Sequence, residues 1–158
     1  MKNRPKLVID TNILVAATRN RDGPSFALLQ LIRFGLVTMC CSPALFLEYE
    51  DVLKRENQLM ASGLSASDID AILSELAGII EPVSTHYQWR PQLRDPSDEM
   101  VLEAAANAQA HAIVTAHDGS QVQDDQRHLP AQGRLPGKGK HAGLLVRAVH
   151  PEETVGLV

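Results

Sequence analysis

Short apolar runs that are typical of buried strands alternate along the chain with longer segments whose apolar residues recur at helical spacing. The expected strands cover residues 7–9, 36–41, 112–115 and 144–149, and the expected helices cover residues 24–34, 43–57, 65–80 and 97–110. Because strands and helices follow one another in turn, the sequence predicts an α/β fold with a mainly parallel central sheet flanked by helices.

Residues with strong preferences for helix ends indicate where several of these helices begin and stop. Ser42 followed by Pro43 is a favourable start, with serine as the N-cap and proline at the first helical position. Ser65 can cap a later helix, because Asp68 follows it at nearly the capping-box spacing. Gly35 is expected to end the helix predicted over residues 24–34.

The length of 158 residues fits a single domain, which we assign to residues 1–158. Hydrophobic residues make up 44% and charged residues 22%, whereas aromatic residues make up only 4%, so the core is expected to be aliphatic. From residue 118 to residue 141 the periodic pattern fails. We interpret that segment as a long loop or a partly disordered insertion.

The sequence favours a cytoplasmic location. No apolar run reaches the roughly 18–20 residues that span a bilayer, and the first apolar stretch is broken at Asp10, so no signal peptide is expected. Cys40 and Cys41 are adjacent and cannot form an ordinary disulfide framework. We therefore expect both thiols to be reduced.

The formal net charge of −4 argues against a protein that wraps nucleic acid by bulk positive charge. It is compatible with a nuclease, because bound metal ions would offset the charge of an acidic site. Basic residues that could contact phosphate are Lys2, Arg4, Lys6, Arg127, Arg134, Lys138 and Lys140. An ordinary solvated surface explains these residues equally well.

Polar residues follow two of the predicted strands at the point where each strand ends. Asp10 comes directly after the strand at residues 7–9, and Asp118 comes shortly after Thr115. In open parallel sheets, sites form outside the carboxyl ends of the strands. Asp10 is therefore a candidate ligand, although Asp-Thr-Asn is also favourable turn chemistry. Asp118 belongs either to the same cluster or to a plain loop.

A third candidate acid lies on the helix that starts at Pro43. Glu48 shares a face of that helix with Leu45 and Val52, where a carboxylate is costly unless it is paired, hydrogen-bonded or bound to metal. Glu50 is a competing candidate, and the spacing favours Glu48. Either residue could instead be solvated on a wide helix face.

Asp98 and Glu99 lie in the first turn of the helix predicted over residues 97–110, where the helix macrodipole favours negative charge. The neighbouring Asp95 and Ser97 are suited to capping that helix. If the next strand lies beside the first one, Asp98 and Glu99 point to the same end of the sheet as Asp10.

Converging carboxylates raise one another's pKa and destabilise a fold unless a cation offsets their repulsion. Mg²⁺ and Mn²⁺ favour oxygen ligands, activate water and stabilise the leaving oxygen of a phosphodiester displacement. The six histidines show no zinc spacing, and the chain contains no phosphate loop, dinucleotide fingerprint or serine elbow. A divalent-metal site is therefore the chemistry that this pattern of acids indicates.

Three stretches resemble, in order, the opening, second and third motifs of PIN-domain ribonucleases, and most closely those of the VapC-like toxins of toxin–antitoxin pairs. They are residues 8–15 (VIDTNILV), 42–50 (SPALFLEYE) and 95–105 (DPSDEMVLEAA), followed by a strand at 112–115 (AIVT) that leads to the fourth. The resemblance implies a parallel sheet with helices on both sides, Mg²⁺ or Mn²⁺, and endonucleolytic cleavage of RNA. It also implies homodimers and inhibition by a small antitoxin protein.

The resemblance assigns roles to individual residues. It implies that Asp10, Glu48 and Asp98 are the metal-site acids, with Glu99 as the alternative to Asp98. It further implies that two polar residues, Asn12 and Thr115, orient the site by hydrogen bonds.

The fourth motif departs from the family pattern. The family usually has Asn or Asp two residues after the threonine and an Asp two residues further on. Here those places hold His117 and Gly119, with Asp118 between them. Asp125 could belong to the same motif displaced by an insertion. The fourth acid, and with it a second metal ion, therefore stays open between Asp118 and Asp125.

The sequence predicts a metal-dependent endoribonuclease, the toxin of a toxin–antitoxin pair. The altered fourth motif motivates an alternative, a PIN-fold module that binds RNA or a partner protein without turnover. A receiver-like phosphate-handling domain is a weaker alternative, since it needs an acidic pair near the first strand and Asp10 stands there alone.

Overall fold

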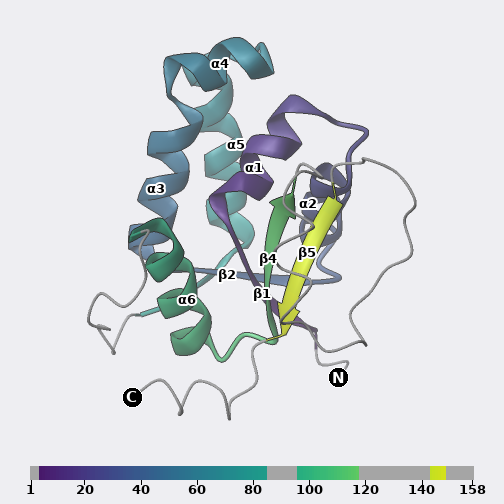
Figure 1. Ribbon diagram of the computed structural model, residues 1–158, viewed down its shortest axis with the longest axis vertical. Helices are drawn as coiled ribbons and strands as arrows, with labels where there is room; N and C mark the ends of the chain where they lie inside the picture. Colours follow the sequence, from purple (N-terminus) through teal and green to yellow (C-terminus); the bar gives the residue numbers. More distant parts are fainter. Residues whose placement is uncertain (1–3, 85–95, 118–142, 149–158) are drawn as a thin grey trace.

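The computed structural model describes residues 4–84, 96–117 and 143–148 (Figure 1). Within these ranges five strands form one sheet in the order β3-β2-β1-β4-β5. The neighbours β3, β2, β1 and β4 pair in parallel, and β5 pairs antiparallel with β4. The strands are β1 (Lys6–Ile9), β2 (Thr38–Cys41), β3 (Glu81–Pro82), β4 (Ala112–His117) and β5 (Gly143–Ala148). The predicted mainly parallel sheet is confirmed.

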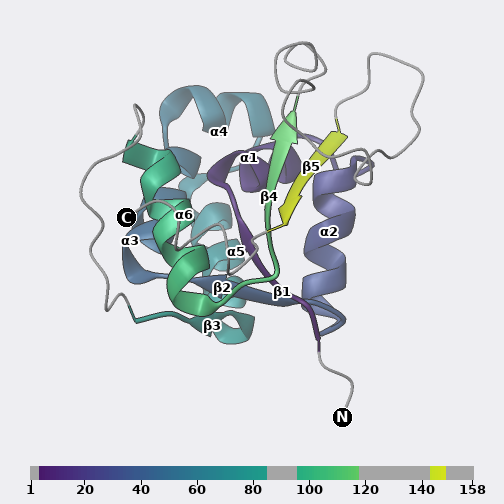
Figure 2. The same ribbon diagram turned by 60° about the horizontal axis from the view of Figure 1, so that its bottom comes forward.

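Six helices accompany the sheet in the described part of the chain: α1 (Thr11–Arg19), α2 (Pro24–Arg33), α3 (Pro43–Leu53), α4 (Glu56–Ser62), α5 (Ala66–Ile79) and α6 (Pro96–Ala108). Figure 2 shows α2 and α6 on opposite sides of β1 and β4, so helices flank both faces of the sheet. The predicted α/β class is therefore confirmed.

The helix ends that the sequence indicated are present. The side chain of Ser42 accepts a hydrogen bond from the backbone N–H of Leu45, at the start of α3. Ser65 and Asp68 form the full capping box of α5. Gly35 has a φ of +71°, the left-handed conformation that glycine adopts most easily after a helix. Helix α2 accordingly ends one residue earlier than the sequence predicted.

Four local features differ from the sequence prediction. Helix α1 was not predicted: Thr11, considered only as part of a turn, begins that helix, and Asp10 is its N-cap. The helix expected over residues 43–57 breaks into α3 and α4, since Arg55 is extended and serves as the N-cap of α4. Neither glycine nor proline marks this break, so the apolar pattern runs through it. The two-residue strand β3 was not expected, and β4 extends past Thr115.

The core is largely aliphatic, as the composition predicted, but its largest fully buried side chain is Tyr49. Cys40 and Cys41 are buried free thiols on β2, in agreement with the expectation that they form no disulfide. Among the described residues no helix is both long and apolar enough to cross a membrane. Residues 85–95, which include Trp89, and residues 118–141 of the expected insertion lie outside the described ranges.

Candidate active site

The parallel register places Asp10 and Thr115 at the same end of two neighbouring strands. Ile9 on β1 pairs with Val114 on β4, and the backbone N–H of Asp10 donates to the carbonyl of Val114 at 2.9 Å. Asp10 and Thr115 are the next residues along these two strands. They therefore lie at the carboxyl edge, where parallel sheets form their sites.

Asp10 is the N-cap of α1, but its side chain does not cap that helix. The residue is extended, with φ −70° and ψ 151°, and its carbonyl accepts from the N–H of Ile13 at 3.0 Å. The side chains of Ser42 and Ser65, by contrast, do accept cap hydrogen bonds. The turn-chemistry explanation thus does not account for the Asp10 carboxylate, which is half-buried.

Glu48 meets the start of α1 from helix α3. The hydroxyl of Thr11 donates to Oε2 of Glu48 at 2.8 Å. Thr11 is buried and Glu48 is half-buried, beside the inner face that α3 forms with Leu45, Tyr49 and Leu53. The carboxylate of Glu48 is therefore bonded to the residue that follows Asp10.

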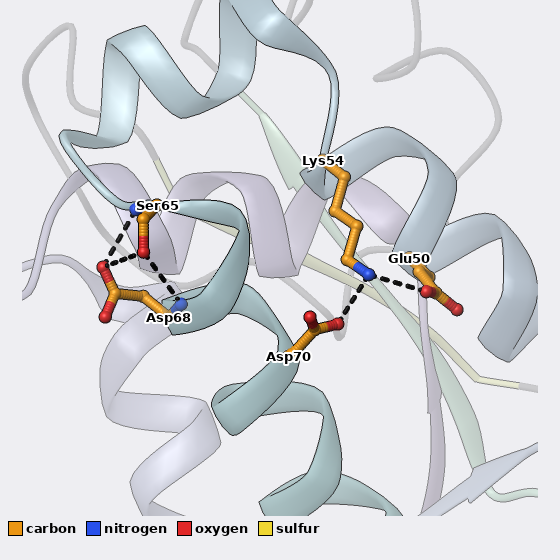
Figure 3. A network of polar contacts seen from close by, with 5 residues as sticks. All are labelled: Glu50, Lys54, Ser65, Asp68 and Asp70. Carbon is orange, nitrogen blue, oxygen red and sulfur yellow. Dashed lines mark hydrogen bonds and ion pairs between the residues drawn. The ribbon is translucent and has the colours of Figure 1, made fainter.

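Glu50, the competing candidate, lies in a different environment (Figure 3). Its carboxylate accepts from Nζ of Lys54 at 2.8 Å, and the same ammonium group contacts Asp70 of α5 at 2.5 Å. Glu50 thus has a cation as its partner and links α3 to α5. The preference for Glu48 over Glu50 stays a prediction, and these contacts support it.

Tyr49 follows Glu48 on α3 and contacts the residue that precedes Asp10. Its side chain is fully buried, and its hydroxyl donates to the carbonyl of Ile9 at 2.5 Å. Burial first, then Cys41, and then the negative charges of Asp10 and Glu48 raise the pKa of Tyr49 well above its ordinary value. Because both carboxylates act on one phenol, Asp10 and Glu48 belong to the same electrostatic neighbourhood.

The two residues expected to orient the site are also placed at this edge. Asn12 forms a pair of hydrogen bonds with the backbone of Ala116: its amide donates to the carbonyl at 3.0 Å, and its Oδ1 accepts from the N–H at 2.9 Å. Asn12 thereby fixes the first turn of α1 against β4. Thr115 is half-buried on β4, opposite Leu145 of β5.

Asp98 and Glu99 belong to the first turn of α6, whose side chains there are outside the described part of the structure. Helix α6 packs on β1 and β2, with Ala104 and Ala105 fully buried. In both views its first turn lies on the side toward which β4 points (Figures 1 and 2). Asp118 and Asp125 lie outside the described ranges. Among the described side chains, no three acidic, histidine or cysteine groups gather closely enough to hold a metal ion.

A family model described as PIN domain matches residues 6–117, which is well over half of the chain. The chain belongs to the PIN-domain family. PIN domains are generally nucleases, which hydrolyse phosphodiester bonds, and they typically use divalent metal ions. No curated protein and no solved structure matches the chain significantly.

The donors of this PIN domain fit a hard divalent cation in their chemistry. Asp10 and Glu48 offer carboxylate oxygens from two different elements at one edge of the sheet. Mg²⁺ commonly binds one or two protein carboxylates and keeps several waters, so a pair of such acids is a sufficient protein contribution. The half-buried position of both residues leaves part of each exposed to solvent.

Two residues of this site were not singled out from the sequence. Thr11 was assigned only to a turn, and Tyr49 was not considered. The signal for Tyr49 was its place four residues after Leu45 on the apolar face of α3, since a buried tyrosine hydroxyl needs a partner. For Thr11 no comparable signal exists, because its partner Glu48 is 37 residues away in the chain.

One of the basic residues considered as a phosphate contact lies far from this edge. Lys6 is the first residue of β1, whereas Asp10 follows its last, and Nζ of Lys6 pairs with Glu81 at 2.6 Å. A side chain at the amino end of the strand, already paired with a carboxylate, does not support a phosphate contact at the site.

Proposed function

We propose that this PIN domain is a divalent-metal-dependent endoribonuclease, with Asp10 and Glu48 among its metal ligands. The observation that carries the proposal is the hydrogen bond between Thr11 and Glu48 of α3, at 2.8 Å, since Thr11 directly follows Asp10 at the carboxyl end of β1. Asp98 or Glu99, from the first turn of α6, and Asp118, beyond β4, are proposed to complete the acidic set.

A bound Mg²⁺ or Mn²⁺ would supply a Lewis acid that lowers the pKa of a coordinated water and offsets charge on the scissile phosphate. The residues of the chain would bind and orient. Asp10 and Glu48 would hold the ion, while Asn12 and Thr115 would orient α1 and β4 at the site. RNA as the substrate and cleavage within the strand are inferred from the motifs at residues 8–15, 42–50 and 95–105.

The motif resemblance also supports a biological role. We propose that the protein is the toxin of a toxin–antitoxin pair, active in the cytoplasm as a homodimer and inhibited by a small antitoxin protein. Coexpression with a cognate antitoxin is expected to suppress both growth arrest and RNA cleavage.

Cleavage of a mixed pool of single-stranded RNA by the purified protein tests the enzymatic proposal. We expect cutting with Mg²⁺ or Mn²⁺, none with EDTA, and none by Asp10→Asn. Asp51→Asn is the matched control, since Asp51 is an exposed acid paired with Arg55 at 2.8 Å. Equal activity of wild type and Asp10→Asn would overturn the proposal.

A second candidate function is a module that binds RNA or a partner protein without turnover. One observation favours it: His117 is the last residue of β4, at a place where family members usually have Asn or Asp. Metal-dependent RNA binding without cleavage under any metal condition would select this module. Cleavage that depends on Asp10 would exclude it.

A further inference from the structure

The residues on either side of Asp10 are both hydrogen-bonded to consecutive residues of α3. The carbonyl of Ile9 accepts from the hydroxyl of Tyr49 at 2.5 Å, and the hydroxyl of Thr11 donates to Glu48 at 2.8 Å. We call these two contacts the α3 brace. The brace crosses between the β1–α1 junction and α3, which are about forty residues apart in the chain.

The brace adds to backbone contacts that already hold Asp10. The N–H of Asp10 donates to Val114 of β4, and its carbonyl accepts from Ile13 within α1. These bonds fix Asp10 relative to the sheet and to its own helix. Among the hydrogen bonds of the described residues, the α3 brace joins the same junction to the helix that carries Glu48.

A packing role alone does not require the Tyr49 hydroxyl. The ring is fully buried among the core side chains and packs edge to face on Phe46, and phenylalanine would fill the same volume. Burying a hydroxyl is unfavourable unless it is hydrogen-bonded. Here the hydroxyl donates to the carbonyl that directly precedes Asp10, and it also interacts with the thiol of Cys41. The hydroxyl therefore adds a geometric constraint at the site that the apolar ring does not provide.

We propose that Tyr49 is a positioning residue, which acts with Thr11 to set the separation between the carboxylates of Asp10 and Glu48. This inference rests on the proposed metal-dependent function. It assigns to Tyr49 and Thr11 a share in metal affinity, although neither residue is a ligand. A site whose ligands are prearranged binds its ion without first ordering the two helices.

The test is Mn²⁺ binding to the metal-free, full-length protein, measured by titration with detection of free Mn²⁺ by electron paramagnetic resonance. Tyr49→Phe and Thr11→Val are each expected to weaken binding by about 10-fold, the lower end of the effect of removing outer-shell partners. Together they are expected to weaken it by less than the product of the single effects, because both act on one separation.

Two further variants separate positioning from general loss of stability. Thr18→Val removes a hydroxyl of the same helix, bonded to the carbonyl of Val15 at 2.8 Å, and is expected to bind Mn²⁺ like wild type. Thr11→Ser retains the hydroxyl and is expected to keep the affinity that Thr11→Val loses. Circular dichroism establishes that each variant is folded at the temperature of the titration.

The outcomes are distinct. Tyr49→Phe and Thr11→Val that bind Mn²⁺ like wild type would overturn the positioning role and leave the metal site intact. If Thr18→Val loses as much Mn²⁺ affinity as these variants, the losses reflect ordinary destabilisation, and the positioning role is also overturned. A wild type that binds no Mn²⁺ would overturn the proposed function, and this inference with it.

Discussion

Helix α3 carries two glutamates two residues apart, Glu48 and Glu50, and the structure treats them differently. Glu48 accepts a hydrogen bond from the buried hydroxyl of Thr11, beside the carboxyl end of the sheet. Glu50 pairs with Lys54, which also binds Asp70, so its charge is offset by a cation (Figure 3). Glu48 thus faces a neutral hydroxyl donor on one side of the helix, whereas Glu50 faces an ammonium group on the other.

The difference supports Glu48, rather than Glu50, as the carboxylate that we propose to bind a metal ion. Within the part of the chain that the structure describes, no ion pair involves the half-buried Glu48. Burying such an acid is costly, and a bound divalent ion would remove that cost. An acid in an ion-pair network already has its counter-charge and contributes to the surface. The comparison is therefore between the acid that we propose as a metal ligand and an acid that links two helices, on one helix of eleven residues.

The largest expected effect separates the two glutamates directly. Glu48→Gln is expected to reduce metal-dependent RNA cleavage by more than about 100-fold, because ligand loss should exceed the effect of losing an outer-shell partner. Glu50→Gln makes the same chemical change two residues away and is expected to retain nearly full activity. Initial cleavage rates of both variants against a single RNA measure the difference.

The reverse result would assign the site acid to Glu50. If both variants lose cleavage activity to a similar extent, α3 tolerates neither change. The proposed difference between Glu48 and Glu50 would then be wrong. Thermal unfolding of each variant in EDTA provides the control, since a rate loss that follows unfolding is not a site effect.

The sequence was sufficient for the α/β class, the parallel sheet and the helix starts at Ser42 and Ser65, because these depend on local patterns of apolar and capping residues. It also indicated that Asp10 would end a strand, and that Glu48 would lie near an apolar face. The break between α3 and α4 could not be predicted, since Lys54 and Arg55 are compatible with continued helix.

The contacts around the site depended on tertiary structure and were not predictable from one sequence. Thr11 and Glu48 come together only because α1 and α3 pack on each other. The same holds for Tyr49 and the carbonyl of Ile9, which are 40 residues apart. Residue types and spacing were sufficient to select Asp10 and Glu48 as candidate acids. They gave no information on the hydroxyl groups of Thr11 and Tyr49, which contact Glu48 and the residue before Asp10.

The second prediction, of intermediate size, concerns the stability of the protein at alkaline pH and the buried thiol of Cys41 on β2. Burial raises the pKa of the Cys41 thiol from its ordinary 9.0 to about 12. Above pH 9.0 the unfolded chain loses a proton that the folded protein keeps, so the free energy of unfolding falls as the pH rises toward 12. The pKa of Tyr49, raised first by burial, acts in the same direction.

Cys41→Ala is expected to flatten this fall, although it lowers stability at neutral pH by removing a buried side chain. Urea unfolding at a series of alkaline pH values measures the slope for both proteins. Asp51→Asn, on the exposed side of α3, should keep the wild-type slope. An identical slope in Cys41→Ala would mean that the buried thiol does not contribute to alkaline unfolding.

The smallest expected effect lies on the outer side of α3. Hydrogen bonds to Asp70 and then Glu50 raise the pKa of Lys54, so this contribution to stability is present below the unfolded pKa of about 10.5 and is lost as the pH rises through the folded value. Lys54→Met keeps most of the side-chain length and removes the charge. Its loss of stability at neutral pH should be smaller than that of Ser42→Ala, which removes the N-cap of the same helix.

Salt distinguishes this network from the site at the other side of the helix. The Debye length is about 10 Å at 0.1 M salt and about 3 Å at 1 M, so the stability difference between wild type and Lys54→Met should shrink as salt is added. Cleavage of RNA by Lys54→Met should match wild type at any one salt concentration, because Lys54 contacts Glu50 and Asp70 rather than Glu48. If Lys54→Met unfolds like wild type but cuts RNA more slowly, Lys54 contacts the substrate rather than only linking α3 to α5. Both sides of α3 would then contribute to RNA cleavage.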